Sequence, residues 1–452
     1  MNKVSIKEKI GYGLGDAAAN IGWRGVGTFL FIFYTDVFGL DPVTVGMLFF
    51  AARLSDGISD IAMGLIGDRT KSKYGKFRPW ILWTAVPLAI SLVLLFSSPD
   101  FSASGKIIYA YITYLFFTLM YTANNIPYGA LMAVMSGNDK ERVSIGSYRM
   151  VGAFGGGILV QGALLFLIAY FGNVDPSIGY SYSMRIMSVV LALLMFVTFY
   201  TTRERVLPLK DQKTNLKKDF KDLLKNRPWW ALLITALFSS SYNAIKQGIV
   251  IIYFTHYLHN QLLAASYLVG LMLVSIVGAI LMTPLSNKYG KRKMFIYSLF
   301  ISGAVISLLI FCDSTAVVLI FVIGLLSELI GAFFSSLTFV MLGDVADYSE
   351  WKNKRRATGL VYSAGSTATK FGGGIAGAVI GLILGAFHYN GQDVTSIEGA
   401  IPGIKMLMSW VPGIVAVIGA GIMLFYPLTK KRMSEITSEL ERRRLDELAK
   451  NF

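Results

Sequence analysis

Residues 42–64 read PVTVGMLFFAARLSDGISDIAMG, an apolar segment that carries two aspartates and one arginine. The segment is long enough to cross the hydrocarbon core of a bilayer as a helix. On that helix Asp56 and Asp60 lie one turn apart on one face, which also carries Arg53. Because a carboxylate in hydrocarbon costs at least about 2.5 kcal/mol, the pair indicates a functional site. Paired oxygens in a polar cavity suit a small cation; a structural Arg–Asp pair that locks two helices is a compatible alternative.

The composition places the whole chain in a membrane. Of its 452 residues 54% are hydrophobic and 15% are charged, with a mean hydropathy of +0.57. Soluble domains have about 25% charged residues. Apolar segments of spanning length cover approximately residues 11–35, 43–66, 79–98, 106–134, 144–171, 180–202, 229–258, 262–286, 294–312, 315–342, 358–387 and 403–427. We therefore predict an all-α membrane protein with twelve transmembrane helices.

The positive charge follows these predicted spans. The formal net charge is +15, and 34 of the 42 Lys and Arg residues fall at alternate ends of the segments. These basic residues lie before residue 10, in 67–78, 136–143, 203–228, 287–293 and 344–357, and after residue 428. By the positive-inside rule these ends are cytoplasmic, so we predict cytoplasmic termini and a multi-pass protein of a bacterial-type inner membrane. Since the charge reports topology, we expect no nucleic-acid partner.

The chain divides into two similar parts. The longest predicted cytoplasmic connection, 203–228, separates a six-helix N-terminal half, 1–202, from a six-helix C-terminal half, 229–428. A charged amphipathic tail, 429–452, follows and is expected to lie on the membrane surface or on the protein. Repeated six-helix halves are typical of transporters that work by alternating access.

Two local patterns have more than one interpretation. Arg149 precedes a glycine cluster at 152–157, but no strand comes before it, so the cluster predicts helix packing rather than a nucleotide-binding loop. His256 and His259 follow each other at i, i+3 near the end of the seventh span. Two histidines alone are a weak metal site, so an interfacial pair is favoured.

Several predicted spans carry polar side chains on one face. In the first span Asp16, Asn20 and Arg24 follow at four-residue intervals, with Trp23 beside them. The eleventh span places Ser366 and Lys370 on one face, and the fourth mixes amides, hydroxyls and aromatic rings, namely Tyr121, Thr122, Asn124, Asn125 and Tyr128. Such groups suit a hydroxyl-rich ligand such as a sugar. For any one of them, a hydrogen bond between helices is the alternative.

Deep basic residues outnumber deep acidic ones. The bases are Arg24, Arg53, Arg149, Lys246 and Lys370, and the acids are Asp16, Asp56, Asp60 and Glu328. If a cation neutralises part of the Asp56/Asp60 pair, the surplus positive charge favours an anionic substrate. Ion pairs within this set are the alternative.

Over nearly its whole length the chain resembles the glycoside–pentoside–hexuronide cation symporters of the major facilitator superfamily. The matching stretches are 11–16 (GYGLGD), 34–37 (YTDV), 56–60, 75–80 (GKFRPW), 125–128 (NIPY), Arg149 and 344–351 (DVADYSEW). The resemblance implies the major facilitator fold of two six-helix halves. It also implies sugar uptake that is coupled to a cation.

The resemblance assigns roles to individual residues. It implies a cation site at Asp56 and Asp60, where Na⁺ would bind in a sodium-coupled carrier, with Thr122 supplying a hydroxyl and Ser59 beside them. It implies sugar contacts at Asn20, Asn125, Arg149 and Lys370, to which the polar faces add Trp23, Arg24, Tyr121, Tyr128, Lys246 and Ser366. The family's melibiose carriers have aspartates in place of Asn20 and Asn125 and a tryptophan in place of Gly129. These departures remove negative charge and point to an acidic saccharide.

We therefore expect a monomeric secondary transporter, not an enzyme, that needs no cofactor and couples inward Na⁺ or H⁺ movement to uptake of a sugar or glycoside, with a uronic-acid-containing saccharide favoured. Cytoplasmic ion pairs are expected to gate it through Asp68, Arg69, Asp344 and Asp347. A lipid or drug carrier of the same superfamily and a non-transporting sugar sensor are the alternatives. A membrane enzyme would need a nucleophile with a base or a metal cluster, and we find neither pattern in the sequence.

Overall fold

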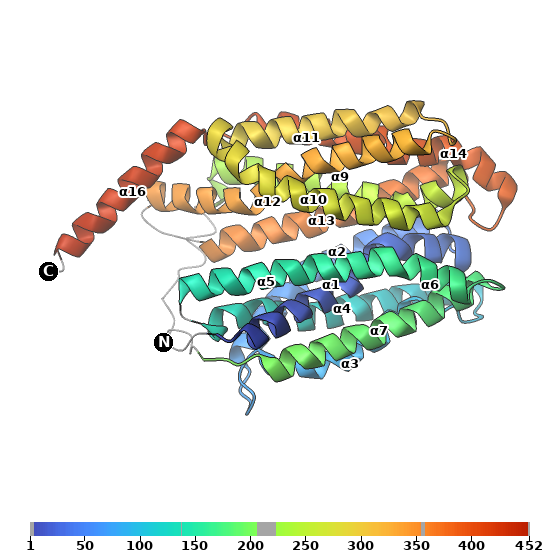
Figure 1. Cartoon of the computed structure of the whole chain (residues 1–452), viewed down its shortest axis with the longest axis horizontal. Coiled ribbons are helices and arrows are strands. Elements are labelled where there is room, and N and C mark those ends of the chain that lie inside the picture. The colour runs from blue at the N-terminus through green and yellow to red at the C-terminus, as the bar shows by residue number, and fades with distance from the viewer. Residues whose placement is uncertain (1–3, 137, 206–222, 354–357, 451–452) are drawn as a thin grey trace. The chain divides into compact units, whose positions relative to one another are not determined.

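The computed structural model describes residues 4–136, 138–205, 223–353 and 358–450. Within these ranges the regular structure is helical (Figure 1). The elements are α1 (Ile6–Ile32), η1 (Phe33–Val37), α2 (Pro42–Arg69), α3 (Arg78–Leu95), α4 (Ala103–Met135), α5 (Asp139–Ile158), η2 (Leu159–Ala163), α6 (Leu164–Phe171), α7 (Pro176–Thr201), α9 (Arg227–Ile252), η3 (Tyr253–Tyr257), α10 (Gln261–Tyr289), α11 (Lys291–Ser307), η4 (Leu308–Phe311), α12 (Val317–Asn353), α13 (Thr358–Ala386), α14 (Val394–Met408), α15 (Trp410–Met423) and α16 (Lys430–Lys450). The predicted all-α class is confirmed.

Most of the predicted spans are long apolar helices. In the described part of the chain, nine helices are long and apolar enough to cross a membrane. Three further helices of 26 to 28 residues, α1, α2 and α9, carry the buried charges of Asp16, Arg53, Asp56 and Lys246. These buried charges lower the mean hydropathy of the three helices. The full count of twelve spans and the side on which the termini lie stay predictions.

The last span begins earlier than its hydropathy pattern indicates. The prediction placed its start near residue 403, whereas α14 begins at Val394 and continues through Pro402 to Met408. A break at Ser409 then separates α14 from α15. The first two turns of α14 contain polar residues such as Thr395 and Glu398, so a hydropathy pattern does not mark them as part of the span.

The helices group into two compact units. Unit 1 comprises Met1–Lys210, Gln247–Met272 and Gly377–Ile404, and unit 2 comprises Asp211–Lys246, Leu273–Ala376 and Lys405–Phe452. Unit 1 therefore contains the helices of the predicted N-terminal half together with parts of α9, α10, α13 and α14. The division into sequence halves at 203–228 stays a prediction.

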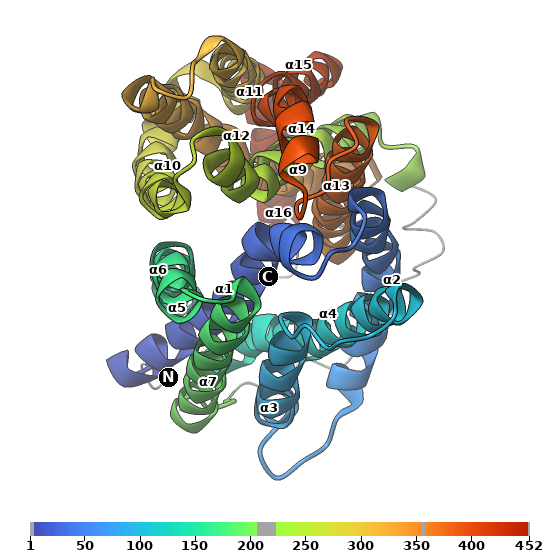
Figure 2. The same ribbon diagram turned by 90° about the vertical axis from the view of Figure 1, so that its right-hand side faces the viewer.

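In unit 1, glycines bring α1 and α5 into backbone contact, and Figures 1 and 2 show the two helices side by side. A Cβ on Gly152 would lie 1.9 Å from the Gly13 carbonyl oxygen, and one on Gly156 would lie 2.3 Å from the Ala17 carbonyl oxygen. Side chains at these positions would force the helices apart. For these two glycines the predicted packing role is confirmed, and the close approach carries Arg149 to the face of α1.

A carboxylate anchors the start of α3 in unit 1. The Glu204 oxygens accept hydrogen bonds from the backbone N–H groups of Lys76, Phe77 and Arg78, at 2.8 to 2.9 Å. These N–H groups would otherwise lack partners at a helix N-terminus, where negative charge is also favoured. Gly75, with a φ of +108°, makes the turn that presents them. The GKFRPW stretch thus forms the end of the connection between α2 and α3 and the first residues of α3.

In unit 2 the charged tail docks on the end of α12. Ile436 and Leu440 of α16 are buried, so this helix packs its apolar face on protein. The Trp351 indole donates to Glu439 at 2.7 Å, and Arg443 donates to the Trp351 carbonyl oxygen at 3.0 Å. The expected amphipathic helix is confirmed for the described residues, with its docking surface on the protein.

Candidate functional site

The two aspartates of α2 have different partners. Asp56 is 3% exposed and accepts a 2.7 Å hydrogen bond from Arg53, which is 8% exposed. Asp60 is half-buried and accepts a 3.1 Å hydrogen bond from the Thr122 hydroxyl of α4. Ser59 donates to the backbone carbonyl of Asp56. The Arg–Asp pair considered as an alternative is therefore present, but both of its members lie on α2, so the ion pair itself joins no two helices.

The carboxylates of Asp56 and Asp60 lie one turn apart on α2, and the Thr122 hydroxyl bonds to the second of them. Among the residues that the structure describes, no group of three or more His, Cys, Asp or Glu side chains could hold a metal ion. A transported cation at Asp56 and Asp60 would therefore use their oxygens with hydroxyl or backbone oxygens such as those of Thr122. Carboxylate, hydroxyl and carbonyl oxygens are suitable ligands for a hard cation.

Arg53 also links the acidic pair to an aromatic surface. Its guanidinium lies over the Trp23 ring of α1, 4.4 Å from the centroid. Trp23 in turn contacts Tyr121 of α4 at 5.2 Å between centroids. Asn125 lies one turn after Tyr121 and donates to its hydroxyl at 3.5 Å, the outer limit of a hydrogen bond. The structure thus brings the predicted cation residue Asp56 and the predicted sugar residues Trp23, Tyr121 and Asn125 into one connected group.

The polar face of α1 forms a second group. Asn20 donates to the Asp16 carbonyl oxygen at 2.9 Å, and its own side-chain oxygen accepts from Arg24 Nε at 3.2 Å. Arg149 reaches across from α5 and donates to the Asp16 carboxylate at 3.3 Å. The four-residue spacing explains the contacts along α1. The Arg149 contact depends on the glycines that let α5 approach.

Tyr128 is less accessible than the sequence pattern predicts. It is fully buried, its ring stacks on Tyr12 at 4.6 Å, and its hydroxyl donates to the Tyr12 carbonyl oxygen at 2.6 Å. The Tyr12 hydroxyl donates back to the Tyr128 carbonyl oxygen at 3.1 Å. This reciprocal pair joins α1 to α4, which is the interhelical alternative considered for these residues.

Unit 2 contains a separate ion pair between a buried lysine and a half-buried glutamate. Lys246 of α9 is 3% exposed and donates to Glu328 of α12 at 3.0 Å. The other Glu328 oxygen accepts from Ser275 of α10 at 2.7 Å, and Lys246 also donates to the Tyr242 hydroxyl at 3.2 Å. Glu328, for which the sequence suggests no partner, thus pairs with a predicted substrate residue. Tyr242 and Ser275 were missed, although Tyr242 lies one turn before Lys246.

The remaining predicted residues of unit 2 lie elsewhere. Ser366 and Lys370 are half-buried and one turn apart on α13. Among the predicted gating residues, Asp344 accepts from Lys291 at 2.6 Å within unit 2. Arg69 is exposed at the end of α2, and the side chain of Asp68 lies outside the described residues. A gating role for these residues and for Asp347 stays a prediction.

His256 has partners that the sequence did not reveal. It contacts Asp36 at 2.6 Å and the Tyr389 hydroxyl at 3.0 Å, whereas His259 is exposed. The partners of His256 come from η1 and from the loop after α13 rather than from His259, and the interfacial role stays a prediction.

A membrane-spanning helical fold that buries several acid–base pairs beside amides and aromatic rings is typical of secondary transporters. Comparison with known proteins agrees. The model of the family described as MFS/sugar transport protein matches residues 11–430. The chain belongs to this family, as a symporter of the glycoside–pentoside–hexuronide type, and is a multi-pass inner-membrane protein.

Relatives of known description match over nearly their full length. The chain is 35% identical to a putative glycoside/cation symporter, YagG, of Escherichia coli, covering 98% of this chain and 96% of the relative. It is 33% identical to the isoprimeverose transporter of Lactiplantibacillus pentosus, covering 99% and 94%. Among solved structures, a D-xylose-proton symporter matches with a TM-score of 0.70 and 15% identity, covering 94% of this chain and 98% of that one. This last likeness concerns the fold alone.

Proposed function

We propose that the protein couples inward movement of Na⁺ or H⁺ to uptake of a sugar or glycoside by alternating access. One observation carries the proposal: Arg53 joins Asp56 to the aromatic pair of Trp23 and Tyr121. A cation residue and a surface on which a sugar ring can stack therefore share a single guanidinium. The relatives described as a glycoside/cation symporter and an isoprimeverose transporter support the same class of substrate.

The coupling step follows from competition for Asp56. When Na⁺ or a proton neutralises the Asp56/Asp60 pair, Arg53 loses part of its electrostatic partner. The guanidinium then shifts relative to Trp23, so the stacking surface changes when the cation site fills. By thermodynamic linkage, a sugar that stacks on the changed surface raises cation affinity by the same factor.

A carrier that holds only the sugar or only the cation is expected to change slowly between its outward-open and inward-open states. Occlusion of the site removes water from its charges, and a buried charge without a partner is costly. The cost is lower in the empty site, in which Arg53 pairs with Asp56, and in a site that holds both a cation and the carboxylate of the favoured substrate. A carrier loaded only with sugar or only with cation bears the full cost, which makes transport coupled.

The substrate that we favour is a saccharide with a carboxylate, such as a uronic acid. Of the deep bases, Arg53, Arg149 and Lys246 contact Asp56, Asp16 and Glu328 respectively. The five deep bases still outnumber the four deep acids, and cation binding increases the surplus. Arg24, held by Asn20, would present a guanidinium to the carboxylate, a geometry that suits two parallel hydrogen bonds. A neutral glycoside is the alternative, and the isoprimeverose relative favours it.

The test uses purified protein in two formats. Thermal unfolding is measured with glucose, glucuronate, a xyloside and their disaccharides, each with and without Na⁺. Proteoliposomes with an imposed Na⁺ or proton gradient then report whether the stabilising saccharide accumulates. Accumulation that collapses with one gradient identifies the coupling ion; stabilisation without accumulation under either gradient would contradict the symporter and support a sensor. Stabilisation only by lipid or by apolar compounds would support a carrier of such molecules.

A further inference from the structure

The same unusual turn ends α1 and α9. η1 reads FYTDV and η3 reads YFTHY, and both are π-helical turns, a form that often marks functional sites. In each, the N–H of the third residue after the turn donates to the carbonyl oxygen of the second residue of the turn: Leu40 donates to Tyr34 at 2.8 Å, and Asn260 donates to Phe254 at 3.0 Å. The second residue after each turn has a positive φ, +76° at Gly39 and +53° at His259. The two segments are structural repeats.

Asp36 and His256 occupy equivalent positions in this repeat, and they bond to each other. The Asp36 Oδ2 atom and the His256 Nε2 atom are 2.6 Å apart, and the two side chains are 12% and 13% exposed. Because the two equivalent residues contact each other, the ends of α1 and α9 are joined at the same position of the repeat. Here the two positions hold an acid and a base, so the contact is an ion pair whenever His256 is protonated.

A third side chain fixes the arrangement of protons. Tyr389, 3% exposed in the loop after α13, donates to Asp36 Oδ1 at 2.7 Å, and its oxygen lies 3.0 Å from His256 Nε2. Burial and the neighbouring Asp36 carboxylate raise the pKa of Tyr389, so it stays a phenol. Since carboxylate oxygens only accept, the proton between Asp36 and His256 belongs to Nε2. The imidazole therefore gains its charge at Nδ1.

The loop after α13 closes tightly on this cluster. A Cβ on Gly391 would lie 2.2 Å from Asp36 Oδ1, so only glycine fits there. Gln392 donates to the Val37 carbonyl oxygen at 3.3 Å. The cluster thus ties three separate segments, η1, η3 and the 387–393 loop, within unit 1.

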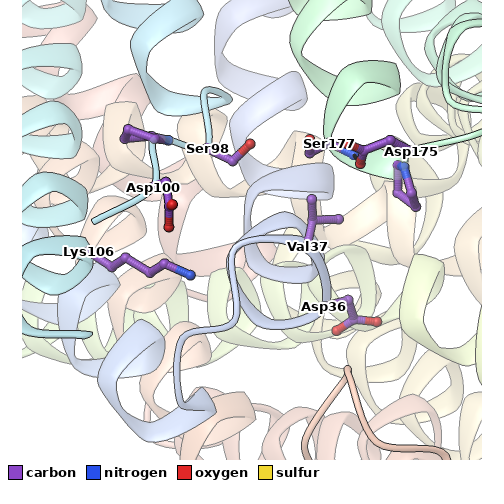
Figure 3. A pocket seen from close by; sticks show the side chains of 9 residues that line it. Asp36, Val37, Ser98, Asp100, Lys106, Asp175 and Ser177 are labelled. Carbon is purple, nitrogen blue, oxygen red and sulfur yellow. Dashed lines mark hydrogen bonds between the residues drawn. The ribbon is translucent and has the colours of Figure 1, made fainter. Parts of the chain in front are cut away.

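Water can reach Asp36 through a cavity of about 310 Å³ on its other side (Figure 3). The cavity is lined by Asp36, Val37, Ser98, Pro99, Asp100, Lys106, Asp175, Pro176 and Ser177. Of the charged groups there, Lys106 donates to the Phe38 carbonyl oxygen at 3.0 Å and Asp175 accepts from the Ser177 N–H at 2.7 Å. The cavity lies at the end of the helices that the charge pattern predicts to be extracellular.

We propose that Asp36, His256 and Tyr389 form a proton-binding latch at the extracellular end of the transport pathway, and that a proton on His256 holds it closed. The inference rests on alternating access but not on the identity of the substrate or coupling ion. It assigns a proton site separate from Asp56 and Asp60. When the latch opens, the Asp36 carboxylate and the His256 imidazolium separate, and both are exposed to water.

The direction of the pH effect follows from linkage. An imidazolium bound to a carboxylate makes a stronger, charge-assisted hydrogen bond than a neutral imidazole. We therefore expect acid outside to favour the closed latch and alkali to favour its opening. Other titratable groups around the cluster are Asp100, Asp175 and Lys106 beside the cavity, Tyr180 of α7, Tyr257 and His259 of η3 and its following turn, and His388 and Asp393 of the loop after α13. The exposed His259 and His388 need their own controls.

The test measures access from outside without any transport. In a Cys312→Ser background, Gln247→Cys places a thiol deeper on the helix that ends in η3, and Val174→Cys, at a position 96% exposed, reports the pH dependence of the reaction itself. In sealed right-side-out vesicles, both are labelled with a membrane-impermeant methanethiosulfonate at external pH from about 5.5 to about 8.5, around the range in which histidines titrate. The ratio of the two labelling rates is the measure of opening.

We expect the ratio to rise several-fold from acid to alkaline pH. His256→Gln should remove this slope, Asp36→Asn should give a high ratio at every pH, and Tyr389→Phe should raise the ratio while keeping the slope. His259→Asn and His388→Asn are matched controls and should keep the parent slope. An unchanged slope in His256→Gln, or its loss in His259→Asn, would overturn the latch. Should Asp36→Asn fail to fold, the histidine variants decide the question, and sugar accumulation, measured separately, reports on the symporter proposal.

Discussion

The two acid–base pairs, Arg53–Asp56 in unit 1 and Lys246–Glu328 in unit 2, differ in what surrounds the acid. Glu328 uses both oxygens, on Lys246 and on Ser275, and the lysine also bonds Tyr242. Its pair joins two helices and has a partner for each oxygen. Asp56 instead shares its helix face with a second acid, Asp60, which accepts a hydrogen bond from Thr122. The first arrangement suits a structural link, and the second suits a site that accepts a further cation.

The largest effect on transport is expected from substitutions of Asp56 and Asp60, the two acids on one face of α2. Asp56→Asn and Asp60→Asn each remove a charge on which cation binding depends, and we expect either to abolish gradient-driven accumulation in proteoliposomes. Saccharide binding, measured by thermal shift, should persist without its Na⁺ or pH dependence. Glu398→Gln, an exposed carboxylate on α14, is the matched control and should transport normally. Normal accumulation in both single variants would remove the distinction between the two pairs.

The Lys246–Glu328 pair, in which both carboxylate oxygens have partners, should contribute to the stability of the fold rather than to the coupling of cation and sugar transport. Lys246→Met leaves Glu328 without its buried counter-charge, and breaking such a pair costs about 3–5 kcal/mol. Glu328→Gln should destabilise as well, while the double variant Lys246→Met/Glu328→Gln should regain part of the loss because no uncompensated charge remains. Thermal unfolding of purified protein measures all three. If the single variants unfold like the parent but lose substrate affinity, Lys246 belongs to the substrate site instead.

Substrate charge gives a smaller and more selective effect. Arg24→Ala is expected to weaken binding of a uronate by about 2 kcal/mol, the size of a lost hydrogen bond to a charged group. The matched ligand is the neutral sugar of the same stereochemistry, whose affinity should change much less. Calorimetric titration of both ligands measures the difference. A neutral sugar that binds better than its uronate, with Arg24→Ala harmless to the latter, would leave the symporter standing and exclude an acidic substrate.

The smallest effect concerns the docked tail. The hydrogen bond from Trp351 and the neighbouring Arg443 lower the pKa of Glu439 below its ordinary 4.5. A lowered pKa stabilises docking above the ordinary value, and this contribution is lost as the pH falls through the pKa of the docked state. The protection factors of the amides in residues 430–443, which compare the observed exchange with that of an unfolded chain at the same pH, should therefore fall below about pH 4.5, the ordinary Glu value. Glu439→Gln should remove this dependence, whereas Glu435→Gln should retain it.

Much of the site was predictable because helical periodicity decides which residues of one segment share a face. The spacing of Asp56 and Asp60 and the polar face of Asp16, Asn20 and Arg24 follow from it. Partners on the same helix, such as Arg53 for Asp56, need no further information. The membrane setting is equally local, since the length and apolar content of each segment determine it.

Contacts between helices are a different matter, because periodicity says nothing about which faces meet. The pairing of Arg149 with Asp16 depends on backbone contact at Gly152 and Gly156, and that of Glu328 with Lys246 on the packing of α9 against α12. Tyr128 has the composition of a sugar contact, yet its burial against Tyr12 came only from the fold.

The clearest division between sequence and tertiary structure lies at Asp36 and His256. The sequence by itself determined a membrane carrier with an acidic pair on α2, since hydrophobicity, charge placement and periodicity act within single segments. It contains both FYTDV and YFTHY, but hundreds of residues separate Asp36 from His256 and from Tyr389. Only the tertiary structure decided that these three side chains meet, because the contact depends on where packing places the ends of α1 and α9 and on the glycine that lets a loop close over them.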